Sequence, residues 1–208
     1  MKEITPYKSV NNAIKSLDNG GRFYNLITKA NDGNITTAEL SKVAGIVSGK
    51  QKMVLFLEMS LLELSTDSRK EILKVLSKDL KSAINKYPTQ FLSPSEAEEK
   101  GTLSQNAIVT GIPTYLESKS DFKGFIMIPI MTGKVTTFTM IPIIDQYDVY
   151  EVRDHNVSEP FLIAHSKSKT KLPKNRYTFG GVLKELNEKE DENASTKVFL
   201  ETHYYVEG

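Results

Sequence analysis

The 208-residue chain contains no cysteine, which excludes disulfide bonds, thiolate metal sites and a cysteine nucleophile. Its net charge is only +1, so no field of the whole chain favours nucleic acid or a membrane as partner. The longest apolar stretch in the N-terminal half, residues 53–64, is too short to span a bilayer and is interrupted by Glu58 and Glu63. No apolar segment follows the charges of residues 1–6, so we expect no signal peptide and a cytoplasmic protein.

Motifs that carry known chemistry are also missing. The sequence has no G-x-S-x-G nucleophile elbow, no Gly-rich phosphate loop and no H-E-x-x-H zinc motif. Glu58 interrupts the most apolar helical segment, and we expect it to face solvent because charged residues are rarely buried without partners. The sequence therefore nominates no cofactor. It leaves the question of catalysis open and favours a protein that is not an enzyme.

Hydrophobic periodicity divides the chain into a helical half and a strand half. Apolar residues recur every three or four positions in five segments, which predicts an N-terminal helical bundle over residues 1–90. These segments are residues 10–17, 23–30, 40–47, 53–64 and 72–87. Residues 91–123 are rich in Ser, Thr, Gly and Pro and are expected to be a connector with one short helix starting after Ser93.

After residue 123 the period becomes strand-like. Residues 196–206 alternate between apolar and polar side chains, and Gly180-Gly181 interrupts a neighbouring strand as a predicted bulge or barrel corner. Short connections favour an antiparallel β meander over residues 124–208 that closes into a small barrel or sandwich. The predicted fold class is therefore α+β, with helices first and strands second.

A repeat at residues 125–143 is the most distinctive feature of the strand half. The pattern F-x-M-I-P-I begins at residue 125 and again at residue 138, and the spacing predicts a β-hairpin with a turn at Gly133. A proline in each strand places this hairpin near an edge or a bulge. Pairing across the turn gathers four candidate partner-binding residues on one face: Phe125, Met127, Phe138 and Met140.

A hairpin that is apolar on both faces needs cover on both. The cover is either the rest of the chain or a partner, which would be a second copy or another protein. Membrane insertion is not expected, because Pro129 and Pro142 would leave carbonyl groups unpaired in lipid.

The densest positive charge lies in the loop at residues 167–176, directly before Tyr177. Cationic loops on small β-barrels bind phosphate backbones, and a neighbouring aromatic ring stacks on bases. An alternative function is therefore binding of nucleic acid or another polyanion. Its candidate residues are Lys167, Lys169, Lys171, Lys174, Arg176 and Tyr177. A solvated loop, compensated by the acidic residues 185–192, is the simpler interpretation.

Residues 31–40 resemble the second half of an EF-hand loop, with Gly33 at the turn and Glu39 at the last ligand position. Calcium takes six or more oxygen ligands, and this segment offers only two charged candidates, Asp32 and Glu39. The simpler interpretation is a glycine turn followed by a capping box, with Thr36 as the N-cap and Glu39 as its partner.

The three histidines, His155, His165 and His203, all lie in the strand half. If their strands converge, they would bind a transition metal, which gives a metal-dependent enzyme as the second alternative. The preferred interpretation remains a non-catalytic binding or assembly module that associates through the hairpin.

Overall fold

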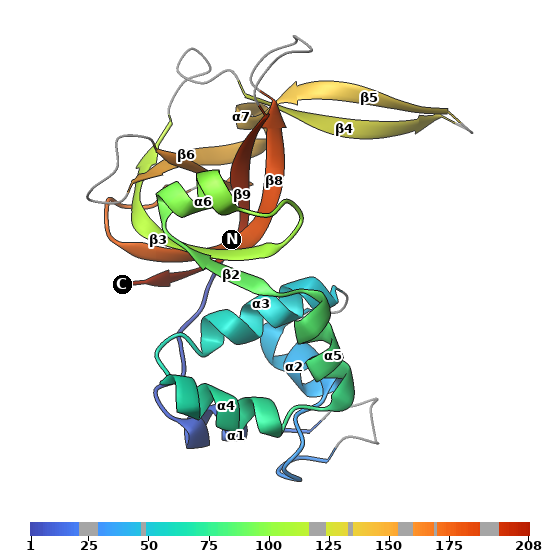
Figure 1. Cartoon of the computed structure of the whole chain (residues 1–208), viewed down its shortest axis with the longest axis vertical. Coiled ribbons are helices and arrows are strands. Elements are labelled where there is room, and N and C mark those ends of the chain that lie inside the picture. The colour runs from blue at the N-terminus through green and yellow to red at the C-terminus, as the bar shows by residue number, and fades with distance from the viewer. Residues whose placement is uncertain are drawn as a thin grey trace. The chain divides into compact units, whose positions relative to one another are not determined.

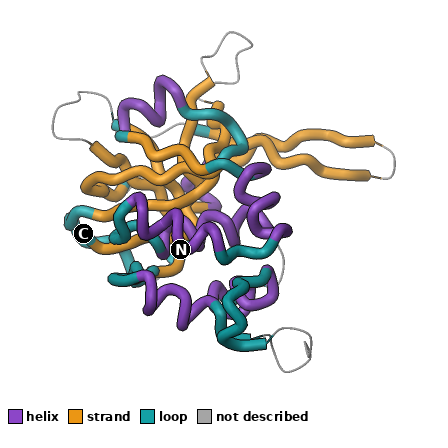
Figure 2. Tube along the Cα trace, turned by 60° about the horizontal axis from the view of Figure 1, so that its bottom comes forward, coloured by secondary structure: helices purple, strands orange, loops and turns teal. Residues whose placement is uncertain are grey.

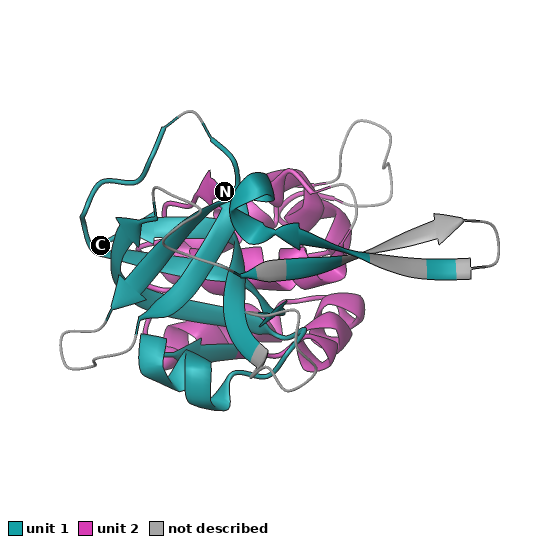
Figure 3. Cartoon of the chain, turned by 90° about the horizontal axis from the view of Figure 1, so that it is seen from above, with its two compact units in different colours: residues 1, 90–208 teal, residues 2–89 magenta. Residues whose placement is uncertain are grey.

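The computed structural model is a mixed α+β protein with seven helices and a closed five-stranded barrel in its described residues (Figure 1). It divides into two compact units, one of residues 2–89 and the other of residues 90–208 together with Met1 (Figure 3). The described residues are 1–20, 29–46, 49–116, 124–132, 135–153, 160–168, 170–187 and 196–208.

The N-terminal unit is helical, but its first element is a strand rather than a helix. Its elements are β1 (Lys2–Glu3), α1 (Val10–Leu17), α2 (Thr37–Ala44), α3 (Lys50–Ser60), α4 (Thr66–Lys74) and α5 (Lys78–Lys86). Four of the helices begin after a Ser or Thr whose hydroxyl accepts a hydrogen bond from the backbone N–H three residues later. Most of α3 is buried, as expected for a central helix.

The expected single helix over residues 72–87 is wrong, because two helices occupy this stretch. α4 ends at Lys74, and Ser77 is the N-cap of α5. Between them the chain forms a parallel bridge, in which Ile35 N–H donates to Val75 O (2.8 Å) and Ser77 N–H donates to Ile35 O (2.8 Å). The apolar stripe continues through this break and so conceals it. The stripe at residues 23–30 falls mostly outside the described residues.

The C-terminal unit holds the barrel. Its elements are β2 (Thr89–Leu92), α6 (Pro94–Lys100), β3 (Asn106–Tyr115), β4 (Phe125–Thr132), β5 (Val135–Pro142), α7 (Ile143–Gln146), β6 (Tyr147–Arg153), β7 (Phe161–Ser166), β8 (Tyr177–Asn187) and β9 (Thr196–Glu207). The closed ring runs β9–β7–β6–β3–β8 and returns to β9, while β4 and β5 extend from β8. Residues 91–123 therefore contain a barrel strand, β3, as well as the expected short helix α6.

The expected antiparallel meander is wrong in two respects. The strand β3 lies between β6 and β8, and β7 pairs with β9 in parallel. A closed ring with an odd number of strands cannot alternate direction all the way round, so at least one parallel pair is geometrically necessary. Leu200, Thr202 and Tyr204 of the predicted β9 face are buried, but after the bulge it is Tyr205 that packs against the barrel core.

The barrel core is built from the inward faces of all five ring strands and from α6. It contains Ala97, Ala107, Val109, Tyr150, Val152, Phe161, Ile163, Tyr177, Phe179, Leu183 and Leu200. A smaller cluster includes Ile143 of α7 together with Leu162 and Phe199. The predicted bulge is confirmed, because the register of β8 and β9 shifts between Gly180 and Gly181.

Candidate functional site

The β4–β5 hairpin carries two of the large apolar side chains that are exposed among the described residues of the barrel unit. Its strands pair from Phe125 opposite Pro142 to Thr132 opposite Val135. Among the described residues, one pairing connects it to the barrel sheet, that of Phe125 with Asn187 of β8, and the hairpin projects away from the barrel (Figure 2). Most of the described length of the hairpin therefore makes no ladder pairing with the barrel strands.

Met127 and Met140 stand directly opposite each other on this hairpin. Their side chains are 50% and 37% exposed, which makes them two of the large apolar residues at the surface. Phe125 and Phe138 occupy positions on the same face by register, and their side chains lie outside the described residues. The shared face predicted from the F-x-M-I-P-I repeat thus agrees with the structure, although the strands pair up to Thr132 opposite Val135 and not across Thr132-Gly133.

The outer edge of β5 pairs with no other strand among the described residues. In an antiparallel ladder, alternate residues of an edge strand turn their N–H and C=O groups outward. Pro129 lies within β4, whereas the proline of β5, Pro142, is its last residue. Residues 135–141 of β5 therefore retain all their N–H groups, and this edge is able to accept another strand.

A pocket of about 460 Å³ lies at the base of the hairpin and extends onto β8 and β9. Ile126, Met127 and Phe199 supply its apolar wall. Its polar wall contains the Tyr147 hydroxyl, which donates to Glu201 Oε1 at 3.2 Å. Burial, followed by the Glu201 charge, raises the pKa of Tyr147, so this phenol stays protonated at neutral pH.

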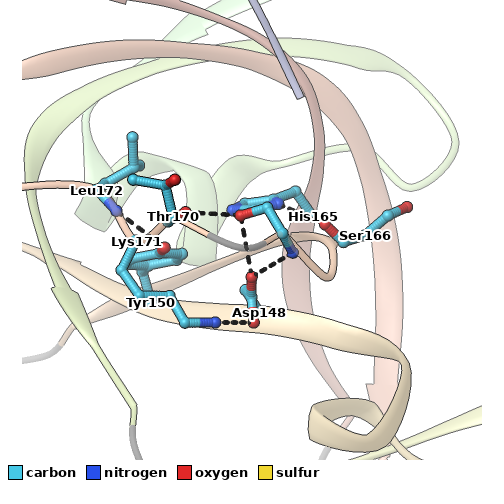
Figure 4. A network of polar contacts seen from close by, with 8 residues as sticks. Asp148, Tyr150, His165, Ser166, Thr170, Lys171 and Leu172 are labelled. Carbon is cyan, nitrogen blue, oxygen red and sulfur yellow. Dashed lines mark hydrogen bonds and ion pairs between the residues drawn. The ribbon is translucent and has the colours of Figure 1, made fainter.

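The basic loop of residues 167–176 is attached to the barrel rather than free in solvent. Asp148 of β6, which is 1% exposed, accepts hydrogen bonds from Ser168 N (2.8 Å) and Ser168 Oγ (3.3 Å) (Figure 4). Lys171 forms an ion pair with the other oxygen of the same carboxylate and lies 4.4 Å from the centre of the Tyr115 ring. Leu172 N donates to Tyr150 Oη at 3.2 Å.

This attachment changes the interpretation of the candidate polyanion-binding residues. Tyr177 is 2% exposed and belongs to the barrel core, so its ring is not presented for stacking on a base. Lys171 is engaged by Asp148. Lys167, Lys174 and Arg176 are exposed, and Lys169 lies outside the described residues. The sequence reasoning missed Asp148, which organises the loop.

The EF-hand-like segment is held by hydrogen bonds within the protein. The buried Glu39 carboxylate accepts from Gly20 N (2.7 Å), Thr36 N (2.8 Å) and Thr36 Oγ1 (2.9 Å), which forms the predicted capping box. Asp18 accepts from Asp32 N (3.3 Å) and Gly33 N (2.8 Å). The carboxylates of Glu39 and Asp18 thus accept hydrogen bonds from the backbone N–H groups of this segment. The exposed Asp32 side chain accepts a hydrogen bond from Asn34 N (3.0 Å).

Glu58 is half-buried, so the expectation of a solvated side chain is wrong. Burial raises the pKa of Glu58, and the positive charge of Arg69 opposes that shift only in part. Arg69 is held nearby because its guanidinium donates to the carbonyls of Leu61 (3.0 Å) and Leu62 (2.9 Å), just past the end of α3.

The histidines do not form a recognisable metal centre among the described residues, where no group of three or more His, Asp or Glu side chains is placed to hold an ion. His165 is buried in β7, His203 lies on β9 beside the bulge, and His155 is outside the described residues. In the same described ranges, none of the helices has the length and hydropathy needed to cross a bilayer.

Comparison with known proteins identifies no family for this chain. Neither the models of known protein families nor the sequences of curated proteins match this chain.

Proposed function

We propose that the protein is a non-catalytic assembly module that pairs with a second copy of itself through the β4–β5 hairpin. The observation that carries the proposal is the open edge of β5, beside the exposed side chains of Met127 and Met140. An unprotected edge strand next to exposed apolar side chains favours pairing with another strand.

A second copy is the occupant that the charges of the hairpin favour. From residue 125 to residue 144 the sequence contains one charged residue, Lys134. Two identical surfaces repel each other when they carry net charge, and this surface carries almost none. A two-fold axis also brings β5 of each copy together in antiparallel orientation, so the same residues contact each other from both sides. Met140 of β5 then lies beside side chains of the second β5 on the same face of the sheet, and part of its apolar surface leaves water.

Light scattering coupled to size-exclusion chromatography tests this proposal through the Met127→Lys/Met140→Glu double variant. Because these residues are cross-strand partners, the new charges attract each other and preserve the hairpin. They also place one charge on β5, the strand that forms the proposed interface, and a second on the strand beside it, and loss of water around such charges is costly. The wild-type chain is expected to be a dimer and the double variant a monomer with unchanged circular dichroism.

The matched control is Leu103→Lys, which changes an exposed apolar residue (43%) of the same unit outside the hairpin. This variant should remain dimeric. A wild-type chain that stays monomeric up to about 100 μM, a range in which even micromolar association is visible, would overturn the proposal. So would a double variant that still dimerises.

A further inference from the structure

One end of the barrel interior is polar. Asp148 of β6 and His165 of β7 stand directly opposite each other, and both are buried, with 1% and 2% of their surface exposed. Two residues further into the barrel, Tyr150 and Ile163 belong to the apolar core. The His165 ring also stacks on Tyr150, with ring centres 5.7 Å apart. The attached basic loop lies over this end (Figure 4).

His165 carries an acceptor that the protein leaves unused. Its Nδ1 lies 2.7 Å from the carbonyl oxygen of Ser166, and because a carbonyl only accepts, Nδ1 must carry the proton. Burial lowers the pKa of His165, which keeps the ring neutral at pH 7 and leaves a lone pair on Nε2. This buried Nε2 has no hydrogen-bond partner among the described residues. Buried polar atoms are normally satisfied, so an orphan acceptor requires an explanation.

A pocket of about 310 Å³ opens beside this histidine. Half of its lining residues are apolar or aromatic, among them Leu172, Pro173, Tyr177 and Tyr205, and the other half are polar or charged. Apolar walls with converging polar groups are the usual composition of a small-molecule site. The mouth of a small β-barrel is also a common place for one such ligand.

We propose that this pocket binds a small, uncharged aromatic or heteroaromatic molecule that donates one N–H or O–H hydrogen bond to His165 Nε2. Its ring would pack against Leu172, Pro173 and Tyr205. A charged ligand is disfavoured because the lining carries charges of both signs, among them Lys171 and Glu207, and Lys171 is already paired with Asp148. None of the pocket residues belongs to the hairpin, so binding here and association of the hairpin are separate properties.

Indole and benzofuran form a matched pair of probes, because benzofuran keeps the bicyclic shape and replaces the N–H donor by oxygen. Titrations followed by ¹H–¹⁵N spectra should show saturable shifts of the Ser168, Thr170 and Leu172 amides with indole. Benzofuran should bind about tenfold more weakly, the size of effect that one net hydrogen bond produces. In the wild-type chain, indole should also shift the side-chain ¹⁵N resonance of His165 Nε2.

The variant His165→Phe keeps a ring against Tyr150 and removes the acceptor, so it should bind both probes equally. The ¹⁵N measurement on wild-type protein decides the question even if this variant fails to fold. Equal affinity of the wild-type chain for the two probes would overturn the proposal. The same conclusion follows if the pocket amides do not shift, or if indole leaves the Nε2 resonance unchanged because water satisfies this atom.

Discussion

Removing the Asp148 carboxylate should detach the basic loop from the barrel. This carboxylate accepts two hydrogen bonds from Ser168 and forms the ion pair with Lys171. The variant Asp148→Ala removes all three interactions and leaves the Ser168 amide without its acceptor. The hydrogen bond from Leu172 N to Tyr150 Oη and the packing of Leu172 against the barrel core remain.

The expected cost follows from the exposure of each partner. A lost hydrogen bond to a charged acceptor costs about 1.5–3 kcal/mol. The Lys171 side chain is 39% exposed, so water replaces much of the ion pair, which contributes no more than about 1 kcal/mol. Ser168 is exposed, so water replaces its longer Oγ hydrogen bond, and only the bond from its amide is counted. The sum is about 1.5–4 kcal/mol. At 1.4 kcal/mol for each factor of ten, local opening of the loop should become at least about tenfold more frequent.

Hydrogen exchange of the Leu172 amide is the appropriate assay. This N–H donates to Tyr150 Oη and not to Asp148, so the variant does not remove its acceptor directly. Faster exchange at Leu172 therefore reports opening of the loop. Exchange that stays within about threefold of the wild-type rate would refute the role assigned to Asp148, because threefold corresponds to less than 1 kcal/mol.

A matched control lies on the same strand. Glu151 pairs with Arg153 at 3.1 Å, with 27% and 56% of the side chains exposed. Surface ion pairs of this kind contribute less than about 1 kcal/mol. The variant Glu151→Ala should therefore leave exchange at Leu172 unchanged, which separates the buried carboxylate from a general effect of charge on β6.

The pH dependence has a definite sign. Burial alone would raise the pKa of Asp148, but the hydrogen bonds from Lys171 and Ser168 outweigh it and hold the pKa below its ordinary value. A carboxylate with a lowered pKa stabilises the fold above its unfolded pKa of about 3.9 and loses this contribution as the pH falls further. The stability difference between wild type and Asp148→Ala should therefore narrow below about pH 4.

Two further substitutions test other parts of the fold. Burial raises the pKa of Glu58, so the ionised carboxylate lowers the stability of the fold at neutral pH. The variant Glu58→Gln should therefore raise the melting temperature at pH 7. Below about pH 4 it should have no effect, because Glu58 is already protonated there. An equal effect at both pH values would contradict this reasoning. A Cβ on Gly181 would lie 2.3 Å from the Glu201 carbonyl oxygen. The variant Gly181→Ala should therefore lower the free energy of unfolding, measured by urea titration, by about 1–3 kcal/mol. An unchanged free energy of unfolding would mean that the backbone of β9 shifts at the bulge to make room for the methyl group.

Patterns in the sequence predicted the structural features that depend on residues close together in the chain. The F-x-M-I-P-I repeat predicted a hairpin with Met127 and Met140 on one face, and the Gly180-Gly181 pair predicted a bulge or a barrel corner. The capping box at Thr36 followed from residues three positions apart. Each of these features is encoded within about ten residues of sequence or by a simple repeat, so one-dimensional patterns reveal them.

Features that depend on contacts between distant segments were not predictable in the same way. The loop at residues 167–176 was read as a solvated cationic segment because its anchor, Asp148, lies 20 residues before Ser168 in the chain. One signal was available, since strand alternation puts Asp148 on the same face as Tyr150 and Val152. The strand order of the barrel has no comparable local signal.

The position of β9 has a consequence for biosynthesis. This strand pairs with β8 on one side and with β7 on the other, so residues 196–207 close the ring. The ring therefore stays open until this segment has left the ribosome, and the strand edges that it later covers remain accessible during synthesis. The helices of residues 2–89 emerge first and contain no ring strand. Translation thus gives the helical unit time to fold before the barrel is able to close.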